Sequence, residues 1–336
     1  MAKRIGESVI ALDDRVCILG HAAVGCRKES EGPLAADFDA LFLDSSLGEP
    51  SWEKAESALQ KAALDRALVH AGLEVGDLHC LFAGDLLNQC VASHYHLRNL
   101  GTPVLGLYGA CSTMTESLLV ASVFVDSGSA DRCGAVTSSH FCSAERQFRY
   151  PLEYGGQRAP TAQWTATASG AAIVGVGDKR VRIADVCPGR IIDKGVTDIN
   201  NMGACMAPAA ADTLLRYFRD TNTQPTDYDL VVTGDLGLVG SDLLSELLKA
   251  DGVDLADRHR DCGLMIYDRE KQDVHAGGSG CGCSASVLCG HLLKQMDAGR
   301  IRNMLILSTG ALMSPTANQQ GESIPGVAHL VHLVSE

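Results

Sequence analysis

Apolar residues along the chain form two kinds of run, one with helical spacing and one continuous. Helical spacing is seen at Trp52, Ala55, Leu59, Ala62 and Ala63. Ser51 before this stripe and Gly72 after it are typical start and stop signals, so a helix is predicted between them. Residues 113–125 and 284–296 are apolar nearly all round, which predicts two fully buried helices. Shorter continuous runs occupy residues 104–108, 133–137 and 304–308, as is typical of parallel strands covered on both faces.

Two blocks of the chain occur twice in the same order. Residues 77–85 match residues 227–235, where a polar turn leads into a short apolar strand that ends in Gly-Asp. Residues 126–139 match residues 297–310, where a glycine-containing turn precedes a strand. The offsets are 150 and 171 positions, so the second copy carries about 21 extra residues, which the charged stretch 250–275 supplies. The repeat predicts one α/β unit used twice.

Each copy follows the order helix, strand, turn, helix, strand. We therefore expect a duplicated α/β protein whose layers run α/β/α/β/α, with the two long apolar helices shared at the centre. The expected halves are residues 1–178 and 179–336.

The charge of the chain limits its partners. The formal net charge of −13 disfavours nucleic acid and direct adsorption to anionic lipid. The longest apolar runs, such as residues 118–125, are much shorter than the ~20 residues that span a bilayer. Glu7, Asp13 and Asp14 interrupt any apolar leader. We expect a soluble, cytosolic protein that reaches a membrane only through protein partners.

The 13 cysteines are expected to be reduced thiols, because their number is odd and no C-x-x-C pair occurs. Cys281 and Cys283 form the only close pair. No second Cys or His pair at zinc spacing accompanies them, so no metal site is expected.

Cys111 is the principal candidate for chemistry. It lies in the turn Tyr108-Gly109-Ala110-Cys111-Ser112-Thr113, which follows a predicted buried strand and opens a predicted buried helix. A thiol at a helix N-terminus has a lowered pKa, and the backbone N–H groups there favour bound anions. The alternative is that Cys111 is a small core residue without a chemical role.

With its duplication and its Ala-Cys-Ser turn, the chain resembles the thiolase and β-ketoacyl synthase superfamily. The resemblance implies a thiolase-like fold with a nucleophilic cysteine at the position of Cys111. Condensing enzymes of this group also use a His, and an Asn or second His, from the second half. Here Thr233-Gly234-Asp235 and Gly280-Cys281-Gly282-Cys283 occupy the matching turns. The resemblance thus implies that the condensation reaction is lost. The alternative is a β-ketoacyl synthase-like acyltransferase that uses Cys111 as nucleophile.

Longer blocks resemble the stage V sporulation protein AD family. They are residues 83–89, 109–113, 144–151, 206–213, 261–267 and 276–281. This resemblance implies a non-catalytic protein that binds dipicolinic acid and works with membrane proteins of the same sporulation operon in dipicolinate uptake into the developing spore. It also implies a homodimer that pairs through first-half strands, peripheral to the spore inner membrane. A scaffold with a vestigial pocket is a further alternative.

Dipicolinate is a flat pyridine with two carboxylates, so its site needs N–H or cationic donors beside an apolar slot. The candidates of this kind are Cys111, Ser112, Thr137, Ser138, Ser139, His140, Arg146 and Arg149. Either arginine offers a bidentate guanidinium to a carboxylate. The alternative is an ion pair of these arginines with Glu145 or Glu153, and for His140 a hydrogen bond within its loop.

Asp85, Asp235 and Cys281 are also expected near the pocket. Both aspartates end Gly-Asp turns, where a carboxylate commonly accepts backbone N–H bonds. A second hypothesis gives them a ligand role: if dipicolinate enters as its calcium chelate, either carboxylate completes an oxygen shell around the calcium.

Overall fold

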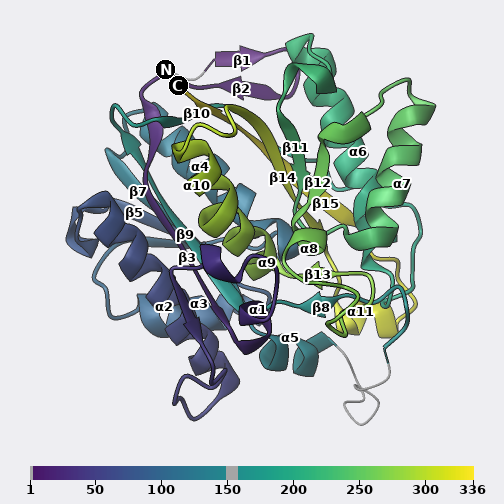
Figure 1. Ribbon diagram of the computed structural model, residues 1–336, viewed down its shortest axis with the longest axis horizontal. Coiled ribbons are helices and arrows are strands. Elements are labelled where there is room, and N and C mark those ends of the chain that lie inside the picture. The colour runs from purple at the N-terminus through teal and green to yellow at the C-terminus, as the bar shows by residue number, and fades with distance from the viewer. Residues whose placement is uncertain (1–2, 149–157) are drawn as a thin grey trace.

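The computed structural model describes residues 3–148 and 158–336, and strands from both halves join in one 13-stranded sheet (Figure 1). The first half supplies β3 (Val16–Cys26), β4 (Ala40–Phe42), β5 (Cys80–Gly84), β6 (Val104–Gly106), β7 (Arg132–Ser139) and β9 (Ala168–Val176). The second half supplies β10 (Val181–Cys187), β11 (Leu230–Thr233), β12 (His259–Asp261), β14 (Asn303–Ala311) and β15 (Gly326–Ser335). An N-terminal hairpin, β1 (Lys3–Ile5) and β2 (Val9–Ala11), adds to β10, while β8 (Trp164–Thr165) and β13 (Gly278–Ser279) pair separately.

The strand order shows the duplication directly. The first half runs β6-β5-β7-β9-β3 and the second runs β12-β11-β14-β15-β10, with equivalent strands at equivalent places. The halves join between β3 and β10, where Cys17 pairs with Arg182. The matched sequence blocks fall on β5 and β11 and on β7 and β14, so the predicted repeat is confirmed.

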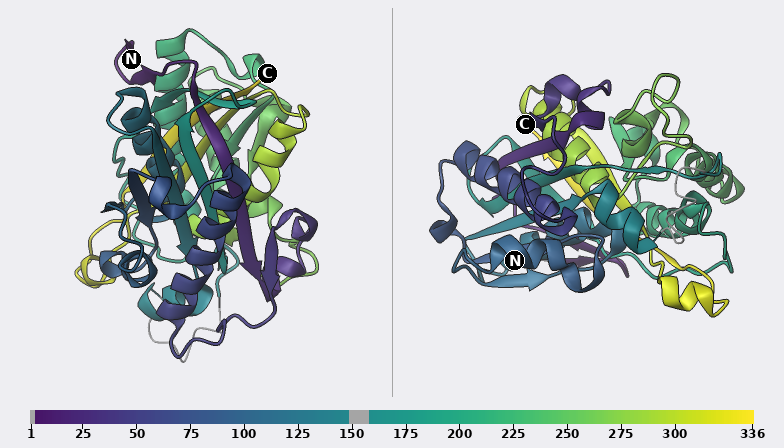
Figure 2. Two further views of the ribbon diagram at one scale, coloured as in Figure 1. Left: turned by 90° about the vertical axis from the view of Figure 1, so that its left-hand side faces the viewer. Right: turned by 90° about the horizontal axis from the view of Figure 1, so that it is seen from below.

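Helices form three layers around the strands (Figure 2). Their bounds are α1 (Arg27–Ser30), α2 (Trp52–Ala71), α3 (Val91–Leu97), α4 (Thr113–Asp126), α5 (Phe141–Phe148), α6 (Met202–Thr221), α7 (Gly237–Ala250), α8 (Cys262–Met265), α9 (Cys281–Ser286), α10 (Leu293–Asp297) and α11 (Pro315–Gln319). α2 packs on β3, β7 and β9, and α6 packs on β14 and β15 with α7 beside it. Between the strands of the first half and those of the second half lie α4 and the helix that begins with α9, so the predicted α/β/α/β/α arrangement is confirmed.

The predicted helix after Ser51 is present as α2. The Ser51 hydroxyl accepts a hydrogen bond from the Lys54 amide, and Gly72 closes the helix in a left-handed conformation with a φ of 68°. Leu59 and Ala63, on the inner face of α2, are fully buried. Local signals of capping and apolar spacing therefore agree with the tertiary packing here.

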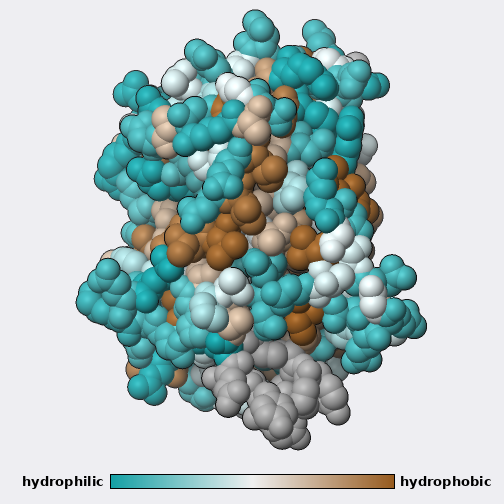
Figure 3. Space-filling model, turned by 90° about the vertical axis from the view of Figure 1, so that its right-hand side faces the viewer, coloured by the Kyte–Doolittle hydropathy of each residue, from teal (hydrophilic) through white to brown (hydrophobic). Residues whose placement is uncertain are grey.

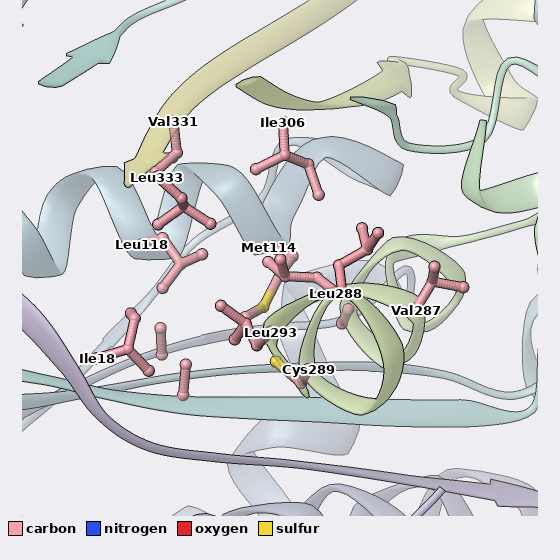
Figure 4. Close-up of a cluster of buried hydrophobic side chains, with 14 of the residues drawn as sticks. Ile18, Met114, Leu118, Val287, Leu288, Cys289, Leu293, Ile306, Val331 and Leu333 are labelled. Carbon is pink, nitrogen blue, oxygen red and sulfur yellow. The ribbon is translucent and has the colours of Figure 1, made fainter. Parts of the chain in front are cut away.

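The central helices form the largest core (Figure 4). Met114 and Leu118 of α4 pack there with Leu288 and Leu293 of the second buried helix. That helix begins at Cys281, and a π-helical turn over Val287–Leu292 interrupts it between α9 and α10. The predicted buried helix over residues 284–296 is confirmed, and the π-helical turn lies within it. The helix passes close to β3 at this turn, since a Cβ on Gly290 would lie 2.9 Å from the Ala23 Cβ.

The run at residues 104–108 was predicted to be a strand covered on both faces, and this was wrong. Its strand, β6, pairs only with β5 among the described strands and forms one edge of the sheet. Leu105 is 43% exposed there, and so is Tyr108. An unpaired strand edge with apolar side chains is a surface suited to further strand pairing.

The outer face of the second half also carries exposed apolar side chains. α7, at the right of Figure 1, exposes Leu238 and Leu247. Hydrophobic side chains gather on this side of the molecule (Figure 3). Exposed leucines on one helix are common on soluble domains and do not by themselves identify a partner.

Candidate ligand-binding site

Hydrogen bonds within the Cys111 turn hold its conformation. A 3₁₀ turn over Ala110–Ser112 leads directly into α4. The Gly109 carbonyl accepts hydrogen bonds from the Ser112 amide, at 3.1 Å, and from the Ser112 hydroxyl, at 2.7 Å. Ala110 has a φ of 51°, a conformation that residues other than glycine rarely adopt. This strained turn fixes the direction of the Cys111 side chain.

A pocket opens at this turn and receives residues from both halves. Its empty space is about 740 Å³, including the open mouth. The described lining residues are Leu86, Tyr108, Ala110, Cys111, Ala144, Glu145, Phe148, Ala162, Gln163, Thr165, Ile199, Asn200, Met202, Ser279, Ala311 and Met313. Most of these side chains are apolar, so the pocket suits a compact molecule with a flat apolar part.

The charge of the pocket is unusual for an anion site. Among the lining residues that the structure describes, none is Lys, Arg or His, and Glu145 is acidic. The neutral polar side chains on the walls, apart from the Cys111 thiol, are those of Tyr108, Gln163, Thr165, Asn200 and Ser279. Gln163 already donates to the carbonyls of Asp235 and Gly278, at 2.8 and 2.6 Å. Neutral donors and backbone groups, and not cations, therefore dominate the described walls.

The thiol of Cys111 does not have the lowered pKa that its place at a helix N-terminus predicts. Burial raises the pKa well above its usual range, and the nearby Asp235 carboxylate raises it further. The thiol lies 3.9 Å from the Ser279 hydroxyl. A neutral thiol is a poor nucleophile, because the thiolate is the reactive form.

Asp235 lies behind Ser279 and Cys111 and is fully buried. Its carboxylate accepts hydrogen bonds from the Gly280 amide at 2.8 Å, the Thr309 hydroxyl at 2.9 Å and the Ser279 hydroxyl at 3.2 Å. Burial raises its pKa to about 6, although these donors oppose the shift. Asp235 thus touches the pocket through Ser279 and is not itself a lining residue.

Asp85 belongs to a separate buried cluster in the first half. Its carboxylate accepts from the Leu87 amide and from the amide and hydroxyl of Ser93, all at 2.8 to 2.9 Å. Burial raises its pKa. The neighbouring Glu56 accepts from the hydroxyls of Ser138 and Ser143, and burial together with Asp85 raises the pKa of Glu56 to about 8. The structural role considered for Asp85, a carboxylate that binds its own turn, is confirmed.

The remaining hydroxyl candidates are fully buried and make bonds inside the protein. The Ser112 hydroxyl donates to Gly109, that of Ser138 to Glu56, and that of Ser139 to the Ala166 carbonyl at 2.7 Å. The Thr137 hydroxyl lies 3.4 Å from the Cys281 carbonyl. They support the site from behind, because none of them lines the pocket.

Two of the cationic candidates, His140 and Arg146, are not among the described residues that line the pocket. His140 is buried, and its Nε2 lies 2.8 Å from the Ser45 carbonyl, as the alternative of a loop hydrogen bond anticipated. Arg146 forms an ion pair with Glu53 at the start of α2. Arg149 and Glu153 lie outside the described residues.

Cys281 begins α9 and packs with Cys111, Leu86 and Ala144 in a small apolar cluster. Its thiol donates to the Ser138 carbonyl at 2.9 Å, and burial raises its pKa well above the usual range. No group of three or more His, Cys, Asp or Glu side chains that could hold a metal ion occurs within residues 3–148 and 158–336. Calcium ligation by Asp85 or Asp235 also competes with the hydrogen bonds that both already accept.

Sequence reasoning missed several residues of the site. Ser279 lies one position before the Gly-Cys turn, and only the glycine-rich block 276–281 pointed to it. Met202, Asn200 and Met313 come from loops and helix starts of the second half, and their spacing carries no signal of a shared pocket. Such residues are found only when the two halves are placed against each other.

Comparison with known proteins identifies the family. The chain matches the family model described as stage V sporulation protein AD (SpoVAD) over residues 6–334. The chain belongs to this family. It is also 47% identical over 327 residues to stage V sporulation protein AD of Bacillus subtilis strain 168, with 97% of this chain and 96% of that protein covered. The expected resemblance to SpoVAD is confirmed, and this SpoVAD family member is a sporulation protein.

Solved structures of condensing enzymes share the fold of this SpoVAD family member. For 3-oxoacyl-(acyl-carrier-protein) synthase III from Aquifex aeolicus, the TM-score is 0.58 at 12% identity, covering 95% of this chain and 99% of that one. For cerulenin-bound OleA from Xanthomonas campestris, the TM-score is 0.61 at 14% identity, covering 96% of this chain and 97% of that one. At this identity the comparison establishes the thiolase-like fold only.

Proposed function

We propose that this protein binds dipicolinic acid in the Cys111 pocket and acts without catalysis in dipicolinate uptake into the developing spore. The observation that carries the proposal is the pocket itself, which opens at the strand-to-helix turn of a SpoVAD family member. Leu86, Phe148 and Met313 offer apolar contact to a flat ring. Ser279, Asn200 and the N-terminus of α4 offer hydrogen-bond donors to carboxylates.

Substituting Cys111 tests the site. Cys111→Ala should weaken dipicolinate binding about three- to tenfold, since it removes one buried contact, and the bulkier Cys111→Leu should weaken it more than tenfold by filling the pocket. Isothermal titration calorimetry measures both. Cys142→Ala on α5 is the matched control, a half-buried thiol that is not among the lining residues. Wild-type affinity in both Cys111 variants would remove this pocket as the site.

The proposal of a non-catalytic role rests on the state of the thiol. Cys111 is buried with a raised pKa, and its closest polar partners are Ser279 and Asp235, not a histidine. The alternative is acyl transfer through a thioester on Cys111. Incubation with an acyl-CoA, followed by intact-mass measurement, separates the two. We expect no added mass, and an acyl adduct absent from Cys111→Ala would establish the enzymatic alternative.

We propose that two copies of the chain pair through the edge strand β6. Its hydrogen-bonding edge and the exposed Leu105 support this pairing. Leu105→Lys should convert a dimer into a monomer in light scattering, because it places a charge at the centre of the interface. Val69→Lys, at a 74% exposed position of α2, should leave the dimer intact. A wild-type protein with the mass of one chain would refute the pairing.

We propose further that the protein reaches the spore inner membrane through membrane proteins of the same operon. None of the helices that the structure describes combines the length and hydrophobicity that a membrane crossing requires. The acidic balance of the chain also disfavours direct binding to anionic lipid. Cell fractionation tests this: the protein should leave the membrane fraction when those partners are deleted, and retention there would oppose the proposal.

A further inference from the structure

A buried carboxylate lies directly behind the pocket floor. Asp235 is fully buried, and it is joined to the pocket by the hydroxyl of Ser279, which lines the floor beside Cys111. We propose that dicarboxylate binding in this pocket is coupled to the uptake of a proton by Asp235, relayed through Ser279. This inference rests on the proposed function and specifies how the site accepts a doubly charged ligand.

The charge of the described pocket walls favours such coupling. A dicarboxylate brings two negative charges to walls that, among the described residues, hold no Lys, Arg or His. A second carboxylate, Asp235, lies one side chain away from it. In a low-dielectric interior, it costs a large free energy to keep two carboxylates ionised at such short range. The carboxylate that is easier to protonate therefore takes up a proton.

The hydrogen bonds around Ser279 provide the route. The Ser279 hydroxyl now donates to Asp235 Oδ2 at 3.2 Å. To donate to a ligand carboxylate, this hydroxyl must turn into the pocket, which removes one of the donors that stabilise the ionised Asp235. A protonated Asp235 instead donates its own proton to the Ser279 oxygen. The Gly280 amide and the Thr309 hydroxyl still bind the carboxyl group, so the turn remains in place.

Other titratable groups pack near Asp235. The thiols of Cys111, Cys262, Cys281 and Cys283 all have raised pKa values and stay neutral near pH 7. Asp261 on β12 is a second buried carboxylate that interacts with Asp235. It accepts from the Thr233 hydroxyl and the Leu236 and Gly237 amides, and burial raises its pKa to about 7.

Two further groups complete the surroundings. His259, with a pKa lowered to about 4 by burial, lies 2.9 Å from Thr233 and is neutral near pH 7. Glu145 faces the pocket from α5. The Ser279 side chain, by contrast, both lines the pocket and donates a hydrogen bond to the Asp235 carboxylate. This places the proton on Asp235 and makes Asp261 the matched control.

The pKa of Asp235 makes the effect measurable. With a pKa of about 6, the Asp235 carboxylate is mainly ionised at neutral pH, so it can take up a proton when the ligand binds. The bound dianion raises this pKa further, and about 0.5–0.9 proton should enter per ligand at pH 7. Because the bound state holds more protons, affinity rises as pH falls, by up to about tenfold per pH unit between pH 6 and pH 8.

Calorimetry in two buffers with different ionisation enthalpies, phosphate and Tris, measures this uptake directly. Dipicolinate binding to the wild-type chain should show a buffer-dependent heat that corresponds to about 0.5–0.9 proton. Asp235→Asn should still bind but take up less than about 0.2 proton, and its affinity should lose most of its pH dependence. Asp261→Asn should keep the wild-type uptake.

The outcomes separate this inference from the proposed function. Clear binding with the same heat in both buffers overturns the proton coupling and leaves the ligand assignment standing. Uptake that persists in Asp235→Asn and disappears in Asp261→Asn also overturns it, by moving the proton to the other carboxylate. Absence of binding in either buffer overturns the proposed function, and the coupling with it.

Discussion

Replacing Gly310 by alanine should disable the site and destabilise the fold at once. A Cβ at this position of β14 would lie 2.1 Å from the Gly109 carbonyl oxygen, which is closer than these atoms can approach, and it would also lie 3.1 Å from the Ser112 amide nitrogen, a tight contact. The strand or the Cys111 turn must therefore shift. We expect a loss of about 3 kcal/mol or more in the free energy of unfolding, and a loss of dipicolinate affinity of more than tenfold.

Gly76→Ala is the matched control for this substitution. A Cβ on Gly76 would meet no atom within 4 Å, so this variant should keep wild-type binding and stability. Thermal unfolding and calorimetry on the two variants measure both effects, and for Gly310→Ala the Tm should fall by roughly 5 °C or more. A Gly310→Ala variant with wild-type Tm and affinity would show that β14 and the turn are less tightly packed than the distances require.

The architecture could be predicted because two independent periodic signals agree. The offsets of 150 and 171 between matched blocks correspond to β5 with β11 and to β7 with β14. The apolar runs at residues 113–125 and 284–296 predicted the two central helices. The edge position of β6 could not be predicted in this way, because its apolar composition is that of a buried strand. The apolar composition of a strand indicates whether it is buried, but it does not say which strands lie beside it, because the tertiary fold sets the strand order.

The site could be predicted only at its centre. Cys111 was found from the strand-to-helix turn, and it lines the pocket. The sequence predicted a lowered pKa for the Cys111 thiol, and this was wrong because its pKa is raised. The prediction considered only the helix N-terminus, which is visible in the local sequence, whereas burial and the nearby Asp235 carboxylate arise from the tertiary fold. Polar residues such as Thr137 and Ser139 follow a strand that was correctly predicted, but their bonds point into the protein. Sequence order places residues near a site without giving their direction.

The buried acid Glu56 shows the same limit and leads to the second large effect. Glu56 and Gln60 lie one turn apart on α2 and are fully buried, although the apolar stripe of this helix gives no reason to expect polar residues inside. Glu56 faces Asp85, which three donors stabilise as a carboxylate. The shared negative charge and the burial therefore keep the proton on Glu56, with a pKa raised to about 8 from 4.5.

Substituting Glu56 by glutamine should change how stability depends on pH. In the folded protein Glu56 keeps its proton up to about pH 8, whereas in the unfolded chain it loses the proton above about pH 4.5. The folded state thus binds more protons within this window, and the free energy of unfolding falls as pH rises, by about 1.4 kcal/mol per pH unit from this group. Between pH 6 and pH 8 the wild-type protein should lose about 2–3 kcal/mol that Glu56→Gln does not lose.

Urea unfolding at several pH values measures the slope, and the comparison between variants isolates Glu56 from the other buried acids. Asp261 and Glu116, whose pKa values burial also raises, to about 7 each, contribute to the slope in both proteins and cancel in the difference. Glu246→Gln, at an exposed position of α7, is the control and should keep the wild-type slope. Equal slopes in wild type and Glu56→Gln would mean that Glu56 is ionised in the fold. In that case the Ser138 and Ser143 hydroxyls would have to stabilise two adjacent carboxylates, which the packing around Asp85 makes costly.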